Sequence, residues 1–515
     1  MTLIKTLNLL KFKRNRGGNM RVSEIAAQQI NTSVNAATWG DLIYNVKAFG
    51  AKGDGITNDS PAVIAAIAAM PAEGGVLYFP PGTYFLVSTV TANKMITITG
   101  SGYSSVITGT ASPLITTDQD VAHKFMVRDI KIVTKSSGTG VFINKTWTAG
   151  AVTSFELMNV WFYASGNAGT LLRIYGARES GLYNCHFEGT LSWATGYGTA
   201  IGLQLDGDNS GGAMNLHYQS LKFLNIYQAV KGYGSATRPD LFAGHHFNNC
   251  EAIACFIGLE FANGGSMDFS DGMLDFCKNP VIMRYWGGAN IHDNYIACKD
   301  ETDYAIQIVP QFGTSEEINI HHNGIYTYGT YTSGTMTARG VVIDGTLGNG
   351  RVQRVIVSKN FMRNFARAVY IQGKDFTYPG YGNLIEGNDI KNCQTAIYLD
   401  TYALYNQIED NTIDVVTTPF TDIGQRNTFF NNRVSEKYGR NSGTYQVGST
   451  AATYTYQFPH GLYGVPKYAV ASAASTQTRD LGQFSVSFDA TNIYINYANP
   501  TTAGLALKWT WFGEV

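Results

Sequence analysis

The chain has 515 residues and a formal net charge of -1, and only 15% of its residues are charged. This low share of charged residues excludes an intrinsically disordered chain. A near-neutral total gives no electrostatic attraction to nucleic acid or to an anionic membrane, so we expect neither partner. No apolar run approaches the roughly 18 residues that a membrane-spanning helix needs.

Residues 1–40 form a basic, weakly patterned segment. Lys5, Lys11 and Lys13 interrupt its short apolar pieces, which argues against a secretory signal. Blocks of like charge are commonly interaction tails. We therefore interpret residues 1–40 as an anchor or linker.

Residues 41–123 read as the opening and capping segment of the fold. Ser60 followed by Pro61 is a helix-start signal, because a side-chain oxygen can cap the free amides and proline fits the first helical position. A short apolar helix over 62–70 ends at Gly74 and Gly75, and strand, turn and strand follow. An apolar helix of this kind suits a plug over an open core.

Residues 124–441 contain an imperfect internal repeat. Phe247, Phe269 and Ile291 follow one another at 22-residue intervals. Each is followed by outward positions, a turn residue that is usually Asn, and another apolar residue. Because Asn tolerates left-handed backbone, we expect these residues to stack at one corner of successive coils: Asn294, Asn323, Asn360, Asn388 and Asn411.

The cysteines follow nearly the same spacing. Cys255, Cys277 and Cys298 recur at almost this interval, and Cys393 occupies an equivalent position. Ligands of a metal would have to converge on one point, whereas these residues spread along an axis. We predict one inward stack of reduced thiols, no metal and no cofactor.

Residues 442–515 lack the Asn pattern. Alternating strands separated by turns predict a small antiparallel β-sandwich. It resembles the compact C-terminal domains of phage fibres and tailspikes, and this resemblance implies that it holds three chains together or binds carbohydrate.

The segments GAKGDGITND and GGVLYFPPGTYFL, on either side of the expected short helix, resemble the opening of the pectate-lyase-like superfamily. Phage tailspikes and depolymerases often carry this segment. The resemblance implies an all-β right-handed parallel β-helix, a homotrimer, and a bacterial surface polysaccharide as partner. It also implies a place in the virion, with the N-terminus attached to the phage tail or to another tail protein.

Aligning the repeats places outward residues of neighbouring coils side by side, about 4.8 Å apart. Asp271 and Asp293 fall on consecutive coils, with His292 and Glu251 beside them. A carboxylate pair about 5 Å apart suits a retaining glycosidase, and a wider pair suits an inverting one. We therefore predict Asp271 and Asp293 as the acid and base or nucleophile, tuned by His292 or Glu251.

Residues near the same coils are candidates for substrate binding. Arg284 can hold an acidic sugar through its planar guanidinium group. Aromatic rings can stack on the C–H faces of sugar rings, and the candidates are Tyr285, Trp286, Tyr295 and Tyr326.

Three functions remain open at the level of sequence. The favoured one is an endo-acting glycoside hydrolase. The second is a polysaccharide lyase, which needs a uronate substrate, a neutralising Arg284 and a base such as His292 or Tyr295. The third is a receptor-binding spike without catalysis, because fold alone does not determine function.

Overall fold

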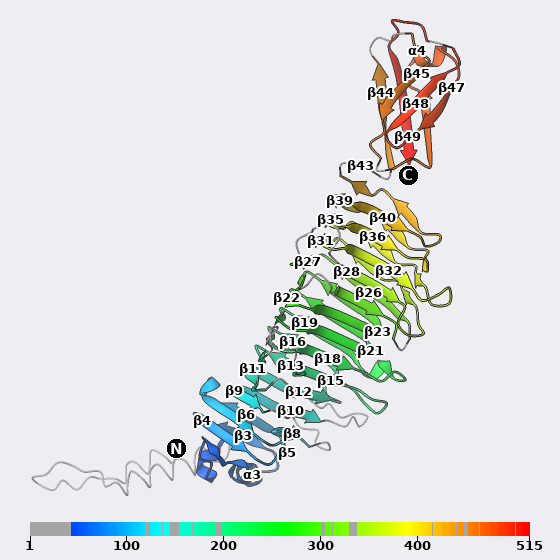
Figure 1. Ribbon diagram of the computed structural model, residues 1–515. Coiled ribbons are helices and arrows are strands. Elements are labelled where there is room, and N and C mark those ends of the chain that lie inside the picture. Colours follow the sequence, from blue (N-terminus) through cyan, green and yellow to red (C-terminus); the bar gives the residue numbers. More distant parts are fainter. Residues whose placement is uncertain are drawn as a thin grey trace, which may run out of the picture.

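A computed structural model gives the fold of the chain (Figure 1). It describes residues 43–515 except 119–123, 136, 145–153, 167, 191–197, 300–303, 312, 329–336, 415, 436, 439, 448–451, 463 and 500. The expected basic anchor, residues 1–40, lies outside the described residues.

Parallel strands wind into a long column with three faces. Strands of the first face pair in series from coil to coil: β5 (Val90–Ala92), β8 (Ile115–Thr117), β10 (Thr139–Asn144), β12 (Thr170–Tyr175), β15 (Ile201–Asp206), β18 (Gln228–Tyr233), the first half of β21 (Ile257–Ser270), the first half of β23 (Asn279–His292), β25 (Tyr304–Val309), β28 (Arg339–Gly345), β32 (Arg367–Gly373), β36 (Thr395–Leu399) and β40 (Thr418–Asp422).

The second face follows the first along each coil and includes the second halves of β21 and β23. Its other strands are β1 (Ile43–Asn45), β3 (Gly75–Phe79), β6 (Ile96–Gly100), the first halves of β9 (Phe125–Thr134) and β11 (Phe155–Ala164), β13 (Arg178–Tyr183), β16 (Met214–Gln219), β19 (Ala243–Asn248), β26 (Ser315–His321), β29 (Val352–Gln353), β30 (Ile356–Ser358), β33 (Gly380–Tyr381), β34 (Leu384–Glu386), β37 (Ala403–Leu404), β38 (Gln407–Glu409) and β41 (Thr428–Phe430).

The third face completes each coil. Its strands are β2 (Asp54–Asn58), β4 (Gly82–Leu86), β7 (Ser105–Gly109), the second halves of β9 and β11, β14 (His186–Glu188), β17 (Lys222–Leu224), β20 (Glu251–Ile253), β22 (Met273–Cys277), β24 (Tyr295–Cys298), β27 (Gly324–Thr327), β31 (Phe361–Arg363), β35 (Asp389–Lys391), β39 (Thr412–Asp414) and β42 (Arg433–Val434). The predicted parallel β-helix is confirmed, and it already begins at β1.

A short helix lies at the N-terminal end of the column, near the blue end of the ribbon in Figure 1. This helix, α3 (Ser60–Ala69), has Pro61 in its first turn and buries Val63, Ala66 and Ile67 against the core of the column. Within the described part of the chain, the other helical turns are η1 (Val46–Phe49), η2 (Gly102–Ser104), η3 (Pro239–Leu241) and α4 (Thr476–Asp480). The predicted capping helix is therefore present.

The register of the coils agrees with the predicted repeat. Phe247 pairs with Phe269, and Phe269 pairs with Ile291 on the next strand. All three side chains are fully buried. The 22-residue spacing thus corresponds to one turn of the helix at this place.

Buried asparagines stack beneath the corner between the second and third faces, as predicted. Asn294 donates through its side-chain amide to Asn323 Oδ1 at 3.1 Å, and Asn323 donates in the same way to Asn360 at 3.0 Å. The row continues through Asn388, Asn411 and Asn432. Each side-chain oxygen also accepts a backbone N–H of the coil before it, so the row fixes the register of the coils.

All six cysteines are buried free thiols. Cys277 pairs with Cys298 on the next coil, and Cys255 occupies the same position on the coil before. Cys393 does not touch this stack, because Phe365 occupies the equivalent position on the coil before it. Burial raises the pKa of the Cys393 thiol to about 12, which keeps it protonated.

Two three-stranded antiparallel sheets follow β43 (Lys437–Tyr438) at the C-terminal end. They contain β44 (Arg440–Val447), β49 (Leu507–Glu514) and β46 (Tyr468–Ala473), and then β45 (Thr455–Pro459), β48 (Asn492–Tyr497) and β47 (Phe484–Phe488). Trp509, Ile493 and Ile495 are fully buried in the core of this unit. The predicted antiparallel sandwich is confirmed, and its first strand begins at Arg440.

Replacing one asparagine of the row should destabilise the column. Asn360→Ala removes the bonds from Asn323 and those to Ile320 O and Asn388, and leaves buried polar groups unpaired. Each unpaired group costs about 1–3 kcal/mol, so we expect a markedly lower Tm by circular dichroism. The exposed loop variant Asn349→Ala is the control; an equal loss of Tm in both variants would contradict a stabilising row.

Candidate active site

In the coils from β9 onward, a tight bend joins the second and third faces. The residue at this bend has a positive φ on consecutive coils, including Asn249, Asp271, Asp293 and His322, with φ between 52° and 58°. Asn, Asp and His are the side chains that most readily tolerate this left-handed conformation. The backbone therefore accounts for the residue types at 271 and 293, apart from any chemistry.

The strands that lead into this bend carry polar side chains whose identity the backbone does not dictate. Asp268 on β21 pairs in register with Asn290 on β23, and Ser270 pairs with His292. The Asn290 side-chain amide donates to Asp268 Oδ1 at 3.1 Å, and His292 Nε2 lies 3.3 Å from the same oxygen. These residues bring two neighbouring coils into one hydrogen-bonded group.

His292 also contacts the bend residue of its own coil. Its Nδ1 lies 2.7 Å from Asp293 Oδ2, so the imidazole is held between the carboxylates of Asp268 and Asp293. The exposed fractions of the three side chains are 22% for His292, 33% for Asp268 and 53% for Asp293. The group is thus ordered by the strands and open to solvent.

The two carboxylates favour the protonated imidazole. Burial of the ring acts against protonation, but the hydrogen bond to Asp293 and the charge of Asp268 outweigh it and raise the pKa of His292. The hydrogen bond from His292 in turn lowers the pKa of Asp293. A proton donor with a raised pKa and an ionised carboxylate therefore lie side by side.

A second histidine extends this group onto the next coil. The ring of His321 on β26 stacks on that of His292, with centroids 4.9 Å apart, and its Nε2 lies 2.8 Å from Asn290 Oδ1. Burial, together with the positive charges of His292 and His322, lowers the pKa of His321. His321 is therefore the neutral member of the stacked pair when His292 is protonated.

Asp271 and Glu251 have other partners. Asp271 Oδ2 accepts a hydrogen bond from the side-chain amide of Asn248 at 2.9 Å, and no described residue bonds its Oδ1. Glu251 lies on the third face and forms an ion pair with Lys222 at 3.1 Å. The structure thus joins His292 to Asp293, leaves one oxygen of Asp271 open, and directs Glu251 toward the preceding coil.

Arg284 and Trp286 both lie on β23, the strand that carries His292, and have partners within the protein. Arg284 is on the first face, where its Nε donates to Glu260 Oε1 at 2.7 Å, so its charge is already neutralised. Trp286 is fully buried, with its ring 5.4 Å from that of Phe261 in the core. Trp286 cannot stack on a sugar, which corrects the expectation from sequence. The side chain of Tyr285 lies outside the described residues.

The other two predicted aromatic residues lie on the third face, just past the bend. The rings of Tyr295 and Tyr326 are 5.2 Å apart, and Tyr295 is 38% exposed. The hydroxyl of exposed Tyr328 donates to Asp275 at 2.7 Å and lies 3.4 Å from that of Tyr295. An aromatic surface therefore adjoins the bend that carries Asp293.

A shallow pocket of about 270 Å³ lies at the other end of the strands that carry Asp268 and His292. Its lining includes Gly265 and Gly287 from these strands and the acidic side chain of Glu316. Gly265 precedes Asp268 by three residues, roughly 10 Å along a strand. The pocket and Asp268 therefore lie along the same strand.

The predicted catalytic set does not include two members of this group, Asp268 and Asn290. The available signal was the alternation of the strands, because Asn290 stands two positions before the predicted His292 and Asp268 occupies the equivalent position on the coil before.

Residues 43–251 match the family model described as rhamnogalacturonase A/epimerase, pectate lyase-like. This match includes the opening segment and confirms the resemblance seen there. A segment of 42 residues is 62% identical to Alginate lyase 7 of Azotobacter vinelandii. It makes up 8% of this chain and only 5% of that relative.

Solved structures with a similar shape include the A-module of mannuronan C-5 epimerase AlgE6 from Azotobacter vinelandii. Its identity is 18% and its TM-score 0.39, over 76% of this chain and 99% of that one. The tailspike gp61 of Pseudomonas phage phi297 is 12% identical with a TM-score of 0.47, over 92% and 99%. Gene product 12 of bacteriophage phi29 is 11% identical with a TM-score of 0.52, over 80% and 58%, and shows the same fold.

Among the described residues, no group of three or more His, Cys, Asp or Glu side chains is arranged to hold a metal ion. Within the same part of the chain, no helix is long and apolar enough to cross a membrane.

Removing either carboxylate beside His292 should lower the pKa of its ring. We expect Asp293→Asn and Asp268→Asn each to move the NMR titration of His292 to lower pH, because each loses an anionic partner of the imidazolium. Because the pKa of His292 is higher in the folded chain than in the unfolded chain, protonation of His292 stabilises the fold. This stabilisation is complete at pH values below the ordinary histidine pKa and is lost as the pH rises through the raised pKa.

The NMR signal of His292 is identified as the signal that the His292→Gln variant lacks. Asp410→Asn is the matched control, because Asp410 occupies the same bend several coils away and bonds Asn431. An unchanged titration in both test variants would contradict the bridging arrangement.

Proposed function

We propose that this chain binds and cleaves a bacterial surface polysaccharide as an endo-acting glycoside hydrolase. The observation that carries the proposal is His292, held between Asp268 and Asp293 on the outer surface and close to Asp271. The matching family model is named after a rhamnogalacturonase and an epimerase, and the short similar segment belongs to an alginate lyase. These names support a carbohydrate substrate.

In the proposed mechanism His292 is the general acid. Asp268 and Asp293 favour the protonated imidazole, and the proton on Nε2, whose contact with Asp268 is the longer of the two at 3.3 Å, transfers to the oxygen of the leaving sugar. Asp271 is the base or nucleophile, because its Oδ1 is open among the described residues and Asp271 lies one coil before Asp293. Spacing between acid and base then decides whether the anomeric configuration is retained or inverted.

Loss of the acid or the base should abolish most of the activity. We expect Asp271→Asn and His292→Gln each to lower depolymerisation by at least about a hundredfold, the usual scale for a positioned acid or base. Asn suits the left-handed bend at 271, so the fold should persist. The assay measures reducing ends released from a panel of capsules and O-antigens.

Asp410→Asn again serves as the control, because it makes the same substitution at a remote bend. Near-wild-type release by both test variants would remove Asp271 and His292 from the mechanism. Glycan binding should survive in both, which separates lost chemistry from lost recognition.

A polysaccharide lyase is the second candidate, and the similarity to an alginate lyase segment is the observation that favours it. A lyase would use His292 or Tyr295 as the base that takes a proton from a uronate. Mass spectrometry distinguishes the two reactions: products with an added water indicate hydrolysis, and unsaturated ends that absorb ultraviolet light indicate elimination. A glycan that binds without being shortened would indicate a receptor-binding spike.

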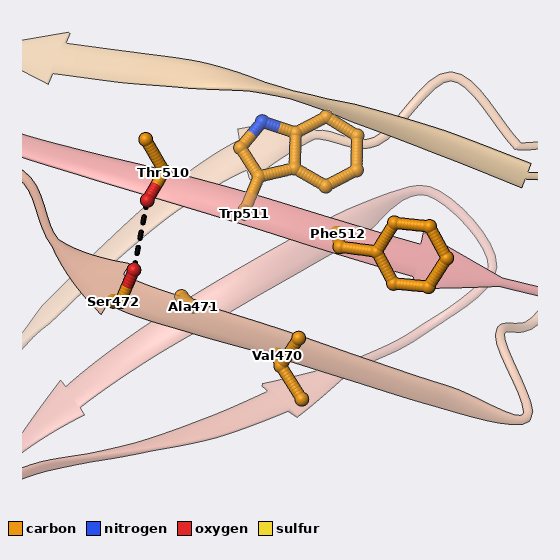
Figure 2. A pocket seen from close by; sticks show the side chains of 6 residues that line it. All are labelled: Val470, Ala471, Ser472, Thr510, Trp511 and Phe512. Atoms are coloured by element: carbon orange, nitrogen blue, oxygen red, sulfur yellow. Dashed lines mark hydrogen bonds between the residues drawn. The ribbon is translucent and has the colours of Figure 1, made fainter.

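We further propose that three copies of the chain assemble through the C-terminal sandwich, in a spike attached to a phage tail through residues 1–40. Figure 2 shows a shallow pocket on this sandwich, between Val470 on β46 and Phe512 on β49. Val470 is 55% exposed and Tyr468 on the same strand is 46% exposed. Burying such an apolar surface between copies would favour assembly.

Light scattering on the purified full chain should give the mass of a trimer. Truncation after residue 441 should give a monomer, and Val470→Lys should weaken the trimer because a buried unpaired charge is costly. Ser485→Lys adds the same charge to an exposed position on the opposite sheet and is the control. A monomeric full chain at micromolar concentration would contradict the proposed assembly.

A further inference from the structure

The first face carries two arginines that, unlike Arg284, form no ion pair with any described residue; the carboxylate of Asp400 interacts with one of them, Arg367, only at longer range. Arg339 on β28 and Arg367 on β32 are register partners on consecutive coils. Their backbones are therefore about 4.8 Å apart. Among the described residues, no carboxylate forms an ion pair with either side chain, and no side-chain hydrogen bond holds either guanidinium group.

Tyrosine rings hold both guanidinium groups in place. The Cζ atom of Arg339 lies 4.9 Å from the ring centre of Tyr370 and 5.5 Å from that of Tyr304. The Cζ atom of Arg367 lies 4.5 Å from the ring of Tyr370 and 3.9 Å from that of Tyr398. Both arginines are half-buried, and stacking on a ring uses the flat face of a guanidinium group, not the N–H groups at its edge.

The acids of the same face are engaged in turns at the far ends of these strands. Asp344 is 6% exposed and accepts hydrogen bonds from Thr346 and Gln307. Asp400 accepts the backbone N–H groups of Tyr402 and Gly373. Arg339 begins β28 and Asp344 lies near its other end, so this acid does not neutralise the arginines by contact.

We propose that Arg339 and Arg367 bind the carboxylate of an acidic sugar residue. Like charges directly opposite each other on paired strands are unfavourable, and a carboxylate between them removes that repulsion. The two planar groups offer charge-assisted, bidentate hydrogen bonds, which a neutral sugar cannot match. The proposal rests on the proposed function, whose substrate it narrows to a glycan that contains uronate or a similar carboxylated sugar.

Isothermal titration calorimetry with polygalacturonate, alginate and hyaluronan tests the site, with dextran as the neutral glycan. The wild-type chain should bind at least one of the acidic glycans and not dextran. The double variant Arg339→Gln/Arg367→Gln should bind that glycan about a hundredfold more weakly, since each charged hydrogen-bonding partner contributes roughly tenfold. Replacing both arginines by Lys should give an intermediate loss, because the charge stays and the planar fork is lost.

A matched double variant, Arg128→Gln/Arg479→Gln, removes two half-exposed or exposed arginines that lie beside their own carboxylates elsewhere. It should bind like wild type. Circular dichroism verifies that each variant is folded. If the double Gln variant does not fold, the double Lys variant still tests the site.

The outcomes separate this inference from the proposed cleavage. Equal affinity of the Gln double variant and the wild type overturns the carboxylate site, whether or not the glycan is cleaved. Binding of dextran as tight as that of the acidic glycans, or no binding of any acidic glycan, overturns it as well. Acidic glycan that binds through the arginines but is never shortened supports the site and contradicts the proposed cleavage.

Discussion

The tight bend between the second and third faces is the constraint on which the rest of this structure depends. It requires a left-handed residue in nearly every coil and leaves backbone groups beneath it that need partners. From Asn294 to Asn432 a buried asparagine supplies those partners, and each one bonds the asparagine of the next coil. The register set in this way determines which residues of distant sequence become neighbours on the surface.

This constraint changes how the acidic residues at the bend should be interpreted. Asp271 and Asp293 occupy positions where Asn, Asp or His is favoured for backbone reasons alone. Asp268 and His292 occupy ordinary strand positions, where many residues would fit equally well. The contacts of His292 with both Asp268 and Asp293 are therefore better evidence of chemistry than the acidic character of the bend.

Much of the fold follows from the sequence because it depends on periodicity. The 22-residue spacing of Phe247, Phe269 and Ile291 sets the register, and the asparagine row follows from the residue type that the bend accepts. The site is less predictable because it depends on the direction and partners of single side chains. Trp286 lies just before a bend marked by Gly287 and Gly288, where simple alternation no longer indicates which side chains face outward.

Pairing between coils is the other feature that the repeat does not reveal. Arg284 is neutralised by Glu260, which lies one coil earlier, and no motif connects the two in sequence. The same limit applies to Asp268, whose importance comes from a histidine on the following coil. Spacing indicates that such residues share a region, whereas side-chain geometry decides which of them bond.

The arginines of the first face have different partners in the earlier and the later coils of the column. In the earlier coils, Arg173 is paired with Asp206 and Arg284 with Glu260. In the later coils, Arg339 and Arg367 rest on tyrosine rings instead of carboxylates. Arg339 and Arg367 therefore differ from Arg284 in what an incoming anion would meet. A carboxylate that approaches Arg284 has to compete with Glu260, whereas one that reaches Arg339 and Arg367 displaces no carboxylate already bonded to them.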